Sequence, residues 1–365
     1  MHYLHPTVLF SEGRVVPITA SYRKEYPSIT KYKLMPLLSH KRTNQPASPL
    51  SIQYHPDISV HTSLMATPSV AIAGATGNLG PAILDALVKA QPPMRVTVLT
   101  RERSSVPQNV LKAPNVVVKV VDYSSASSIA SALTAITHCI STLPSHALDV
   151  QKSLIDGCVA GGVGHFIPSE FGANFLDPVL RTIPTFGPKA EVDEYVEQLR
   201  LGGKIEYTLI RVGAFLDWGL NGWLIDPRNK KAELWDGGDA VMSLTTLSTI
   251  AKVVIQVVRG QTVGKNIIQI SDTNLSQKQL LKLCQEVVGA DGWQITTLDV
   301  ESRVQLATDR LYNGEAELDD YVAFIKKALT RPGNAAHWDK DDNDLLGIQT
   351  LTDAELKDII EGIIS

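Results

Sequence analysis

The chain has 365 residues, of which 44% are hydrophobic and 20% charged, and a formal net charge of −4. This length can bury a large core, and the composition is that of an ordinary globular protein. The charge gives no sign of the basic surface typical of nucleic-acid-binding proteins, and no apolar run reaches the ~18 residues of a membrane span. Three cysteines without a CxxC pair (Cys139, Cys158 and Cys284) fit neither a disulfide framework nor a zinc site, and they point to a reducing, cytoplasmic environment.

The first 64 residues differ in composition from the rest. They contain seven basic and three acidic residues, a net charge of +4, which leaves −8 on residues 65–365. They also hold five of the nine histidines and show no sustained helix or strand period. One interpretation is a transit peptide. The other, which the diffuse signal favours, is a disordered or wrongly assigned extension over residues 1–65, with Met65 as the working start.

From Ser69 on, predicted strands alternate with predicted helices. We expect strands at residues 70–73, 95–100, 115–121, 137–142, 165–168 and 207–212, and helices at 81–90, 125–135, 147–159 and 191–201. This alternation predicts an α/β fold, a doubly wound parallel Rossmann sheet with helices on both faces, over residues 66–212.

Residues 213–365 are predicted to form a smaller substrate-binding cap, with segments that return to the Rossmann core. We expect a helix at 246–258, a strand at 266–270, and a helix at 276–288 with Ser276 as its N-cap. In open α/β sheets, ligands bind in the crevice at the carboxyl ends of the strands, beneath such a cap.

A glycine-rich loop joins the first of these strands to the first helix. Glycines at its three fixed positions let the backbone turn tightly and approach a diphosphate, while the helix N-terminus offers unpaired N–H groups. The alternative is a turn in an α/β fold that binds no ligand. We expect dinucleotide contacts from Gly74, Thr76, Gly77, Asn78, Leu79 and Gly80.

The end of the second strand indicates which dinucleotide binds. An NAD site usually has an acid there, but this chain has Arg101, 21 positions past Gly80. A guanidinium can bind a 2′-phosphate, which predicts NADP(H) as the cofactor. Glu102 complicates the site, Arg103 is a second candidate, and a solvated surface arginine is the alternative.

Two further strand ends supply candidate cofactor contacts. Asp122, followed by Tyr123, ends the third strand and is expected to meet the adenine. Ser141 and Thr142 end the fourth strand and are expected to line the path of the nicotinamide.

The sequence lacks the usual catalytic pair of Rossmann reductases, because no tyrosine is followed by a lysine four residues later. Four histidines (His138, His146, His165 and His337) are scattered over the rest of the chain, so we expect no metal site. His165, at a strand start, is interpreted as structural.

Four segments in order resemble the isoflavone reductase-like proteins, the NmrA-like branch of the atypical short-chain dehydrogenases. They are GATGNLG at 74–80, LTR at 99–101, IPSEFG at 167–172, and FGPKAEVDEYVE at 186–197. The resemblance covers about 300 residues and includes DNDLLG at 342–347. The Ser-Glu-Phe-Gly segment with its downstream lysine is its most specific part.

The resemblance implies NADPH as hydride donor and Lys189 as general acid/base. It further implies that Pro168, Ser169, Glu170 and Phe171 shape the nicotinamide side. The plant enzymes usually have two arginines after the lysine, where this chain has Asp193 and Glu194, which puts their isoflavone, lignan and phenylcoumaran substrates in doubt. Without the resemblance, Lys189 would be read as a solvated lysine near a helix start.

Four aromatic residues are candidates for the substrate pocket, although each fits a core role equally well: Phe175, Phe215, Trp218 and Trp223.

Two functions remain open. The first is an NADPH-dependent reductase of a small aromatic or conjugated secondary metabolite, in which the ammonium protonates the atom that gains charge as hydride arrives. The second is a non-catalytic NADP(H) sensor like NmrA itself, which needs no proton donor. We expect a small-molecule partner, no nucleic acid and no membrane, and a monomer or homodimer.

Overall fold

The computed structural model describes residues 8–11, 14–17, 67–144, 148–183, 186–331 and 333–365, so the predictions for His146 and for most of residues 1–65 lie outside the described residues. The chain divides into two units, Met1–Ala66 and Thr67–Ser365. In the first unit, β1 (Val8–Ser11) pairs antiparallel with β2 (Arg14–Pro17), two strands that the sequence pattern did not predict.

The second unit is built on a parallel six-stranded sheet, as predicted. Its strand order is β5-β4-β3-β6-β7-β8. The chain runs outward from β3 on one side and then returns to build β6 on the other, so the order reverses between β3 and β6, which is where such sheets bind ligands. The strands are β3 (Ser69–Ala73), β4 (Arg95–Thr100), β5 (Val116–Val120), β6 (His138–Ser141), β7 (His165–Ile167) and β8 (Glu206–Tyr207).

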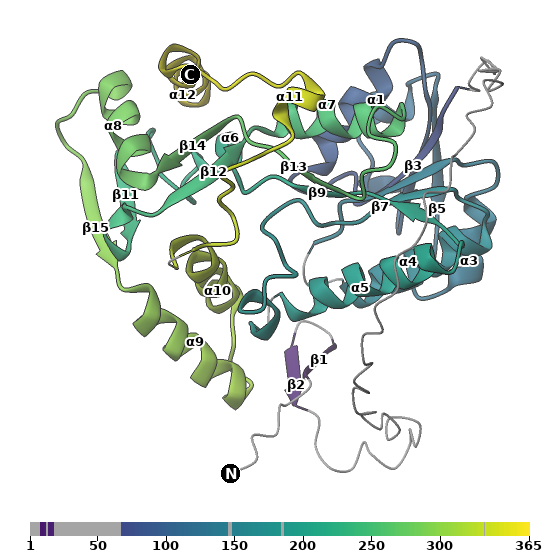
Figure 1. The fold of residues 1–365 in the computed structure, drawn as a ribbon, viewed down its shortest axis with the longest axis horizontal. Coiled ribbons are helices and arrows are strands. Elements are labelled where there is room, and N and C mark those ends of the chain that lie inside the picture. The colour runs from purple at the N-terminus through teal and green to yellow at the C-terminus, as the bar shows by residue number, and fades with distance from the viewer. Residues whose placement is uncertain (1–7, 12–13, 18–66, 145–147, 184–185, 332) are drawn as a thin grey trace, which may run out of the picture. The chain divides into compact units, whose positions relative to one another are not determined.

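Helices cover both faces of this sheet (Figure 1), with α1 (Gly80–Lys89) and α7 (Leu247–Val258) on one face and α3 (Ala126–Ala132), α4 (Leu148–Ala160) and α5 (Gly187–Leu201) on the other. Successive side chains of a strand point to opposite faces. Val70 and Ile72 therefore pack in the core with α1 and α7, whereas Ala71 and Ala73 pack in the core with the other three helices. This explains why the strand is a continuous apolar run.

The predicted sixth strand, residues 207–212, is divided in two in the structure. β8 pairs with β7, and the next segment, β9 (Leu209–Arg211), pairs with β13 (Ile267–Gln269). The change of partner occurs at Thr208, whose N–H donates to the Phe166 carbonyl at 3.1 Å, while the N–H of Leu209 donates to the Asn266 carbonyl at 2.8 Å. The prediction of one strand was wrong because a single sequence run pairs with two different neighbours.

Residues 213–365, predicted as the cap, form small sheets of their own and share a hydrophobic core with residues 173–186. β12 (Val241–Thr245) lies between β10 (Ala214–Phe215) and β14 (Thr273–Ser276), and β11 (Lys231–Trp235) pairs with β15 (Gln294–Leu298). Ser276 is the N-cap of α8 (Gln277–Val288), as predicted, and the structure adds a capping box with Gln279. The remaining helices of the cap are α6 (Leu216–Gly219), α9 (Val300–Asn313), α10 (Leu318–Thr330) and α12 (Asp353–Ile364).

A late segment of the chain returns to the strands next to the main sheet. Asp342 accepts a hydrogen bond from the N–H of Gln269, and Asn343 exchanges hydrogen bonds with the backbone of Ser271. This attaches α11 (Asn343–Leu346) to the end of β13. Short elements complete the fold: η3 (Arg103–Ser105), α2 (Gln108–Leu111), η5 (Leu180–Thr182) and η6 (Asp236–Gly238). Among the described residues, none of the helices has the length and apolar character needed to cross a membrane.

Candidate functional site

The glycine loop forms a tight turn between β3 and α1. Gly74 has a φ of +83°, and a Cβ there would lie 2.6 Å from the carbonyl oxygen of Thr142. A Cβ on Gly80 would lie 2.2 Å from the carbonyl oxygen of Gly74. Neither position can accept a side chain, so the loop is pressed against the end of β6 on one side and against itself on the other.

The start of α1 offers its N–H groups without competition from a side chain. No side chain caps this helix, and its first turn contains no acidic residue. Thr76, Gly77 and Asn78 are exposed, whereas Leu79 is buried in the core, which leaves only its backbone for a ligand. Pro81 has no N–H, and the N–H groups of Ala82 and Ile83 donate to the Leu79 carbonyl, so the backbone donors left for a ligand at this ten-residue helix are those of residues 78–80. Together with the positive end of the helix dipole, they form an arrangement that binds anions.

Arg101 follows the end of β4 and is exposed, with no ion-pair partner among the described residues. The turn that carries Arg101 is held by the hydroxyl of Thr100, which donates a hydrogen bond to the Glu102 carbonyl at 2.8 Å. Asp122 lies two residues past the end of β5, and its carboxylate already accepts two hydrogen bonds from Ser124, which lower its pKa.

The two candidate residues at the end of β6, Ser141 as its last residue and Thr142 just after it, differ in their hydrogen bonds. Ser141 is fully buried, and its hydroxyl has no hydrogen-bond partner among the described residues. Thr142 bonds to the carbonyl of Ala73 through both its N–H, at 2.8 Å, and its hydroxyl, at 2.9 Å. Thr142 therefore fixes the end of β6 against the end of β3, directly beside Gly74.

Lys189 is buried, which distinguishes it from an ordinary surface lysine. Helix α5 begins at Gly187, four residues earlier than predicted, and Lys189 lies in its first turn. The ammonium donates to the Ser169 carbonyl at 2.7 Å and lies 4.6 Å from the centroid of the Phe175 ring. Ser169 in turn is held by its hydroxyl, which donates to the Leu143 carbonyl at 2.7 Å, and by its N–H, which donates to Gln151 at 2.8 Å. These bonds tie the loops after β6 and β7 to the lysine.

Three further ionisable side chains are buried around Lys189. The exposed fractions are 8% for Lys189, 1% for Glu170, 3% for Asp193 and 7% for Arg211. Burial raises the pKa of Glu170 well above its usual range and raises the pKa of Asp193 to about 7, although the nearby cations oppose both shifts. Burial likewise lowers the pKa of Arg211, against the effect of Asp193 and Glu170.

Sequence reasoning missed Asp193 as a buried group and missed Arg211 altogether. Two signals for them were present. Asp193 follows Lys189 by four residues, which places the two on one helix face, and Arg211 is a charged residue in an otherwise apolar strand, where charges are rare unless paired. His165 is structural as predicted, since its ring contacts the Thr208 hydroxyl at 3.0 Å and burial lowers its pKa to about 4.

The aromatic candidates fall into two groups. Phe175 is buried beside Phe186 and Lys189. Phe215, Trp218 and Trp223 are half-buried and form a chain with centroid distances of 6.5 and 5.7 Å, which continues to the buried Trp235 at 5.2 Å. This row of three aromatic rings lies in the cap. Of the four candidates, Phe175 is the one that contacts Lys189.

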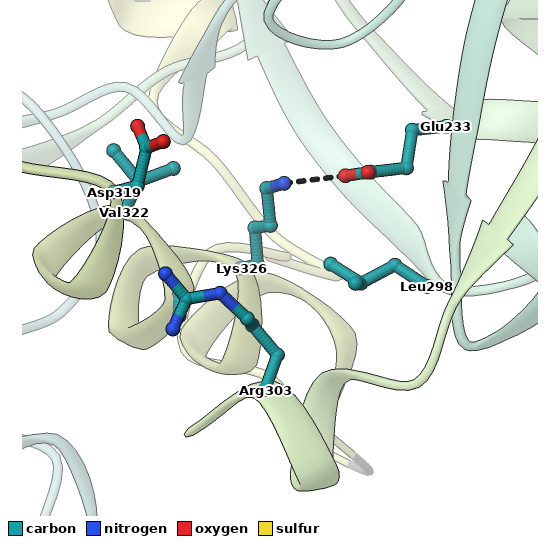
Figure 2. Close-up of a pocket in the computed structure, with 7 residues that line it drawn as sticks. Glu233, Leu298, Arg303, Asp319, Val322 and Lys326 are labelled. Carbon is teal, nitrogen blue, oxygen red and sulfur yellow. Dashed lines mark hydrogen bonds and ion pairs between the residues drawn. The ribbon is translucent and has the colours of Figure 1, made fainter. Parts of the chain in front are cut away.

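A cavity of about 210 Å³ lies in the cap between β11, β15, α9 and α10, away from Lys189. Figure 2 shows Lys326 reaching from α10 toward Glu233 of β11, to which it donates at 2.6 Å. Arg303 is likewise paired, with Asp320 at 2.8 Å. This volume is below the ~300 Å³ of ordinary ligand pockets, and the cations at the cavity are already neutralised.

Residues 66–296 match the model of the NmrA-like family. The chain belongs to the NmrA-like family. Among curated proteins, this NmrA-like chain is similar to the oxidoreductase aprR of Aspergillus flavus, with 28% identity over 254 residues, which span 68% of this chain and 83% of that protein.

Solved structures of two reductases share the fold of this NmrA-like protein. One is isoflavone reductase, with a TM-score of 0.61 and 18% identity, over 80% of this chain and 98% of that chain. The other is the complex of leucoanthocyanidin reductase with NADPH from Vitis vinifera, with a TM-score of 0.59 and 16% identity, over 81% of this chain and all of that one. At this identity, the likeness establishes the fold and the expected architecture.

Proposed function

We propose that this NmrA-like protein is an NADPH-dependent reductase of a small aromatic or conjugated secondary metabolite, with Lys189 as general acid/base. The observation that carries the proposal is the buried ammonium of Lys189, held on the Ser169 carbonyl just past the end of β7. This is the carboxyl edge of the parallel sheet, where the glycine loop also lies. An ammonium without a carboxylate partner is costly to bury, and such groups are concentrated at functional sites.

The residues at this edge fit a dinucleotide. The bare N-terminus of α1 and the glycine loop would hold the diphosphate, and Arg101 would hold the 2′-phosphate. Ser141, with its unpartnered buried hydroxyl, would lie on the nicotinamide side together with the 168–171 segment. When bound, NADPH supplies the hydride. The oxidoreductase name of the Aspergillus relative and the NADPH of the leucoanthocyanidin reductase complex support this assignment.

The protein's own contribution to the chemistry is proton transfer. The Ser169 carbonyl accepts a hydrogen bond from Nζ of Lys189 and the Phe175 ring lies beside it, and these two contacts hold Nζ in place. From there the ammonium can protonate the substrate oxygen or carbon that gains negative charge. General acid catalysis of this kind contributes roughly 10²–10⁴-fold to the rate.

The test is NADPH oxidation by the purified protein against a panel of enones, quinones and benzylic ethers. We expect wild type to oxidise NADPH with one class, and Lys189→Ala to lose roughly 10²-fold or more in kcat while still binding NADPH, because only the proton donor is removed. Lys204→Ala is the matched control, since Lys204 is an exposed lysine just after α5.

The same experiment separates the reductase from the sensor. Saturable NADP(H) binding without turnover on the whole panel would favour a non-catalytic sensor. Turnover that survives in Lys189→Ala would refute the role of the lysine but leave the reductase intact.

A further inference from the structure

Around Lys189, four ionisable side chains from three parts of the fold share one buried volume. Glu170 comes from the loop after β7, Lys189 and Asp193 from α5, and Arg211 from β9. At least nine-tenths of each residue is buried. The cluster holds two acids and two bases, so its net charge depends on which acids carry a proton.

Several polar atoms of this cluster lack hydrogen-bond partners. Neither carboxyl oxygen of Glu170, nor Oδ1 of Asp193, nor Nη2 of Arg211 has a hydrogen-bond partner among the described residues. None of the four groups forms an ion pair within 4.0 Å with another, so they act on one another through space. Unsatisfied buried polar groups are rare in native proteins and need an explanation.

Asp193 is placed to act on Lys189. The two residues lie four positions apart on α5, which puts their Cβ atoms on one face about 5–6 Å apart. We propose that Asp193 is a positioning residue, whose buried carboxyl group sets the charge balance at Lys189 and so determines up to which pH the lysine remains a proton donor. This inference rests on the proposed reductase function and deepens it.

The sign of this effect on Lys189 follows from the titratable groups that surround Asp193. They are Glu170 from the β7 loop, Arg211 from β9, Tyr207 from β8, and Lys189 and Glu194 from α5. Burial raises the pKa of Asp193 to about 7. Below that pH the carboxyl group is neutral. Above it the carboxyl group is negatively charged, and an opposite charge at this range favours the protonated form of an amine, which is the effect that the proposal assigns to Asp193.

Asp193→Asn removes this charge with almost no change of shape. We expect the alkaline limb of kcat against pH to move to lower pH by about one unit, because an opposite charge at this range shifts a pKa by about 1–3 units. Asp193→Glu, which keeps the carboxylate, should return the limb toward wild type. Glu191→Gln, the same chemical change at an exposed residue of α5 paired with Lys152, should leave the profile unchanged.

A second measurement uses the wild-type protein alone. Infrared difference spectra, recorded with and without isotope-labelled aspartate, should contain the carbonyl band of a protonated aspartic acid that disappears as the pH rises through about 7. This readout does not depend on whether Asp193→Asn folds.

The outcomes are distinct. An unshifted limb in a folded, NADPH-binding Asp193→Asn, or the absence of a titrating aspartic acid band in wild type, would overturn this inference while the reductase function stands. Wild type without turnover on any substrate overturns the proposed function instead. A shifted limb in Asp193→Asn, with a normal one in Asp193→Glu and Glu191→Gln, supports the inference.

Discussion

Two exposed arginines at opposite ends of β4 allow a direct test of cofactor choice. Arg95 begins the strand and Arg101 follows its last residue, on the edge that carries the glycine loop. If Arg101 binds the 2′-phosphate, its charge matters for NADPH and not for NADH, since NADH lacks that phosphate.

We expect Arg101→Ala to weaken NADPH binding by about tenfold or more, and NADH binding little, because a charge-assisted hydrogen bond contributes about 1.5–3 kcal/mol. Arg95→Ala removes the same group and charge and should change neither affinity. Fluorescence titration with both dinucleotides measures this. Equal losses for NADPH and NADH in Arg101→Ala would contradict the phosphate-binding role.

For Lys189, sequence and structure contribute different information. Periodicity placed the helix start at residue 191 and gave no reason to bury the lysine; the resemblance alone singled it out. The structure adds that α5 begins at Gly187 and that the Nζ of Lys189 is bonded to Ser169. Asp193 was noticed only as a departure from the plant pattern, and its burial depends on how α5 packs against the sheet.

At the level of elements, the β3–loop–α1 unit was predictable because its chemistry is local. The glycines, the strand and the helix are contiguous, and Gly74 and Gly80 are required by contacts that a Cβ would violate. Gly77 is different: a Cβ there would lie 3.5 Å from the Gly74 carbonyl oxygen, an ordinary contact.

This difference predicts that alanine at the two positions has different effects on stability. Gly80→Ala forces the loop apart and should lower the free energy of unfolding by about 1–3 kcal/mol, with loss of NADPH binding. Gly77→Ala should keep the wild-type melting temperature and lose affinity only, because its methyl group occupies space on the exposed side that we propose faces the cofactor. Thermal melts and NADPH titration of both variants provide the check, and a destabilised Gly77→Ala would contradict this assignment.

At the scale of the whole molecule, the chain divides into a short first unit, Met1–Ala66, and a long second unit, Thr67–Ser365. Among the residues whose burial the structure describes, the three hydrophobic cores lie between Val70 and Ile360, within the second unit. The change of composition near residue 65 therefore coincides with a structural boundary.

We expect a chain of residues 65–365 to fold alone, with an unchanged melting temperature and NADPH affinity, since it retains these cores and the proposed site. Differential scanning calorimetry and titration against the full chain test this. A lower melting temperature in the shorter chain would show that the first unit contributes to stability.

The sequence by itself determined the order of strands and helices, the parallel sheet and the position of the glycine loop. These depend on periodicities and turn residues that are local in the chain. The elements between residues 213 and 245, β14, the elements after residue 288 and the division of the strand at Thr208 were not predicted. For the strands among them, pairing with a distant strand overrides local pattern. Only the tertiary structure brings Glu170, Asp193 and Arg211 around Lys189, since residues up to 41 positions apart become neighbours through the packing of α5 against the sheet.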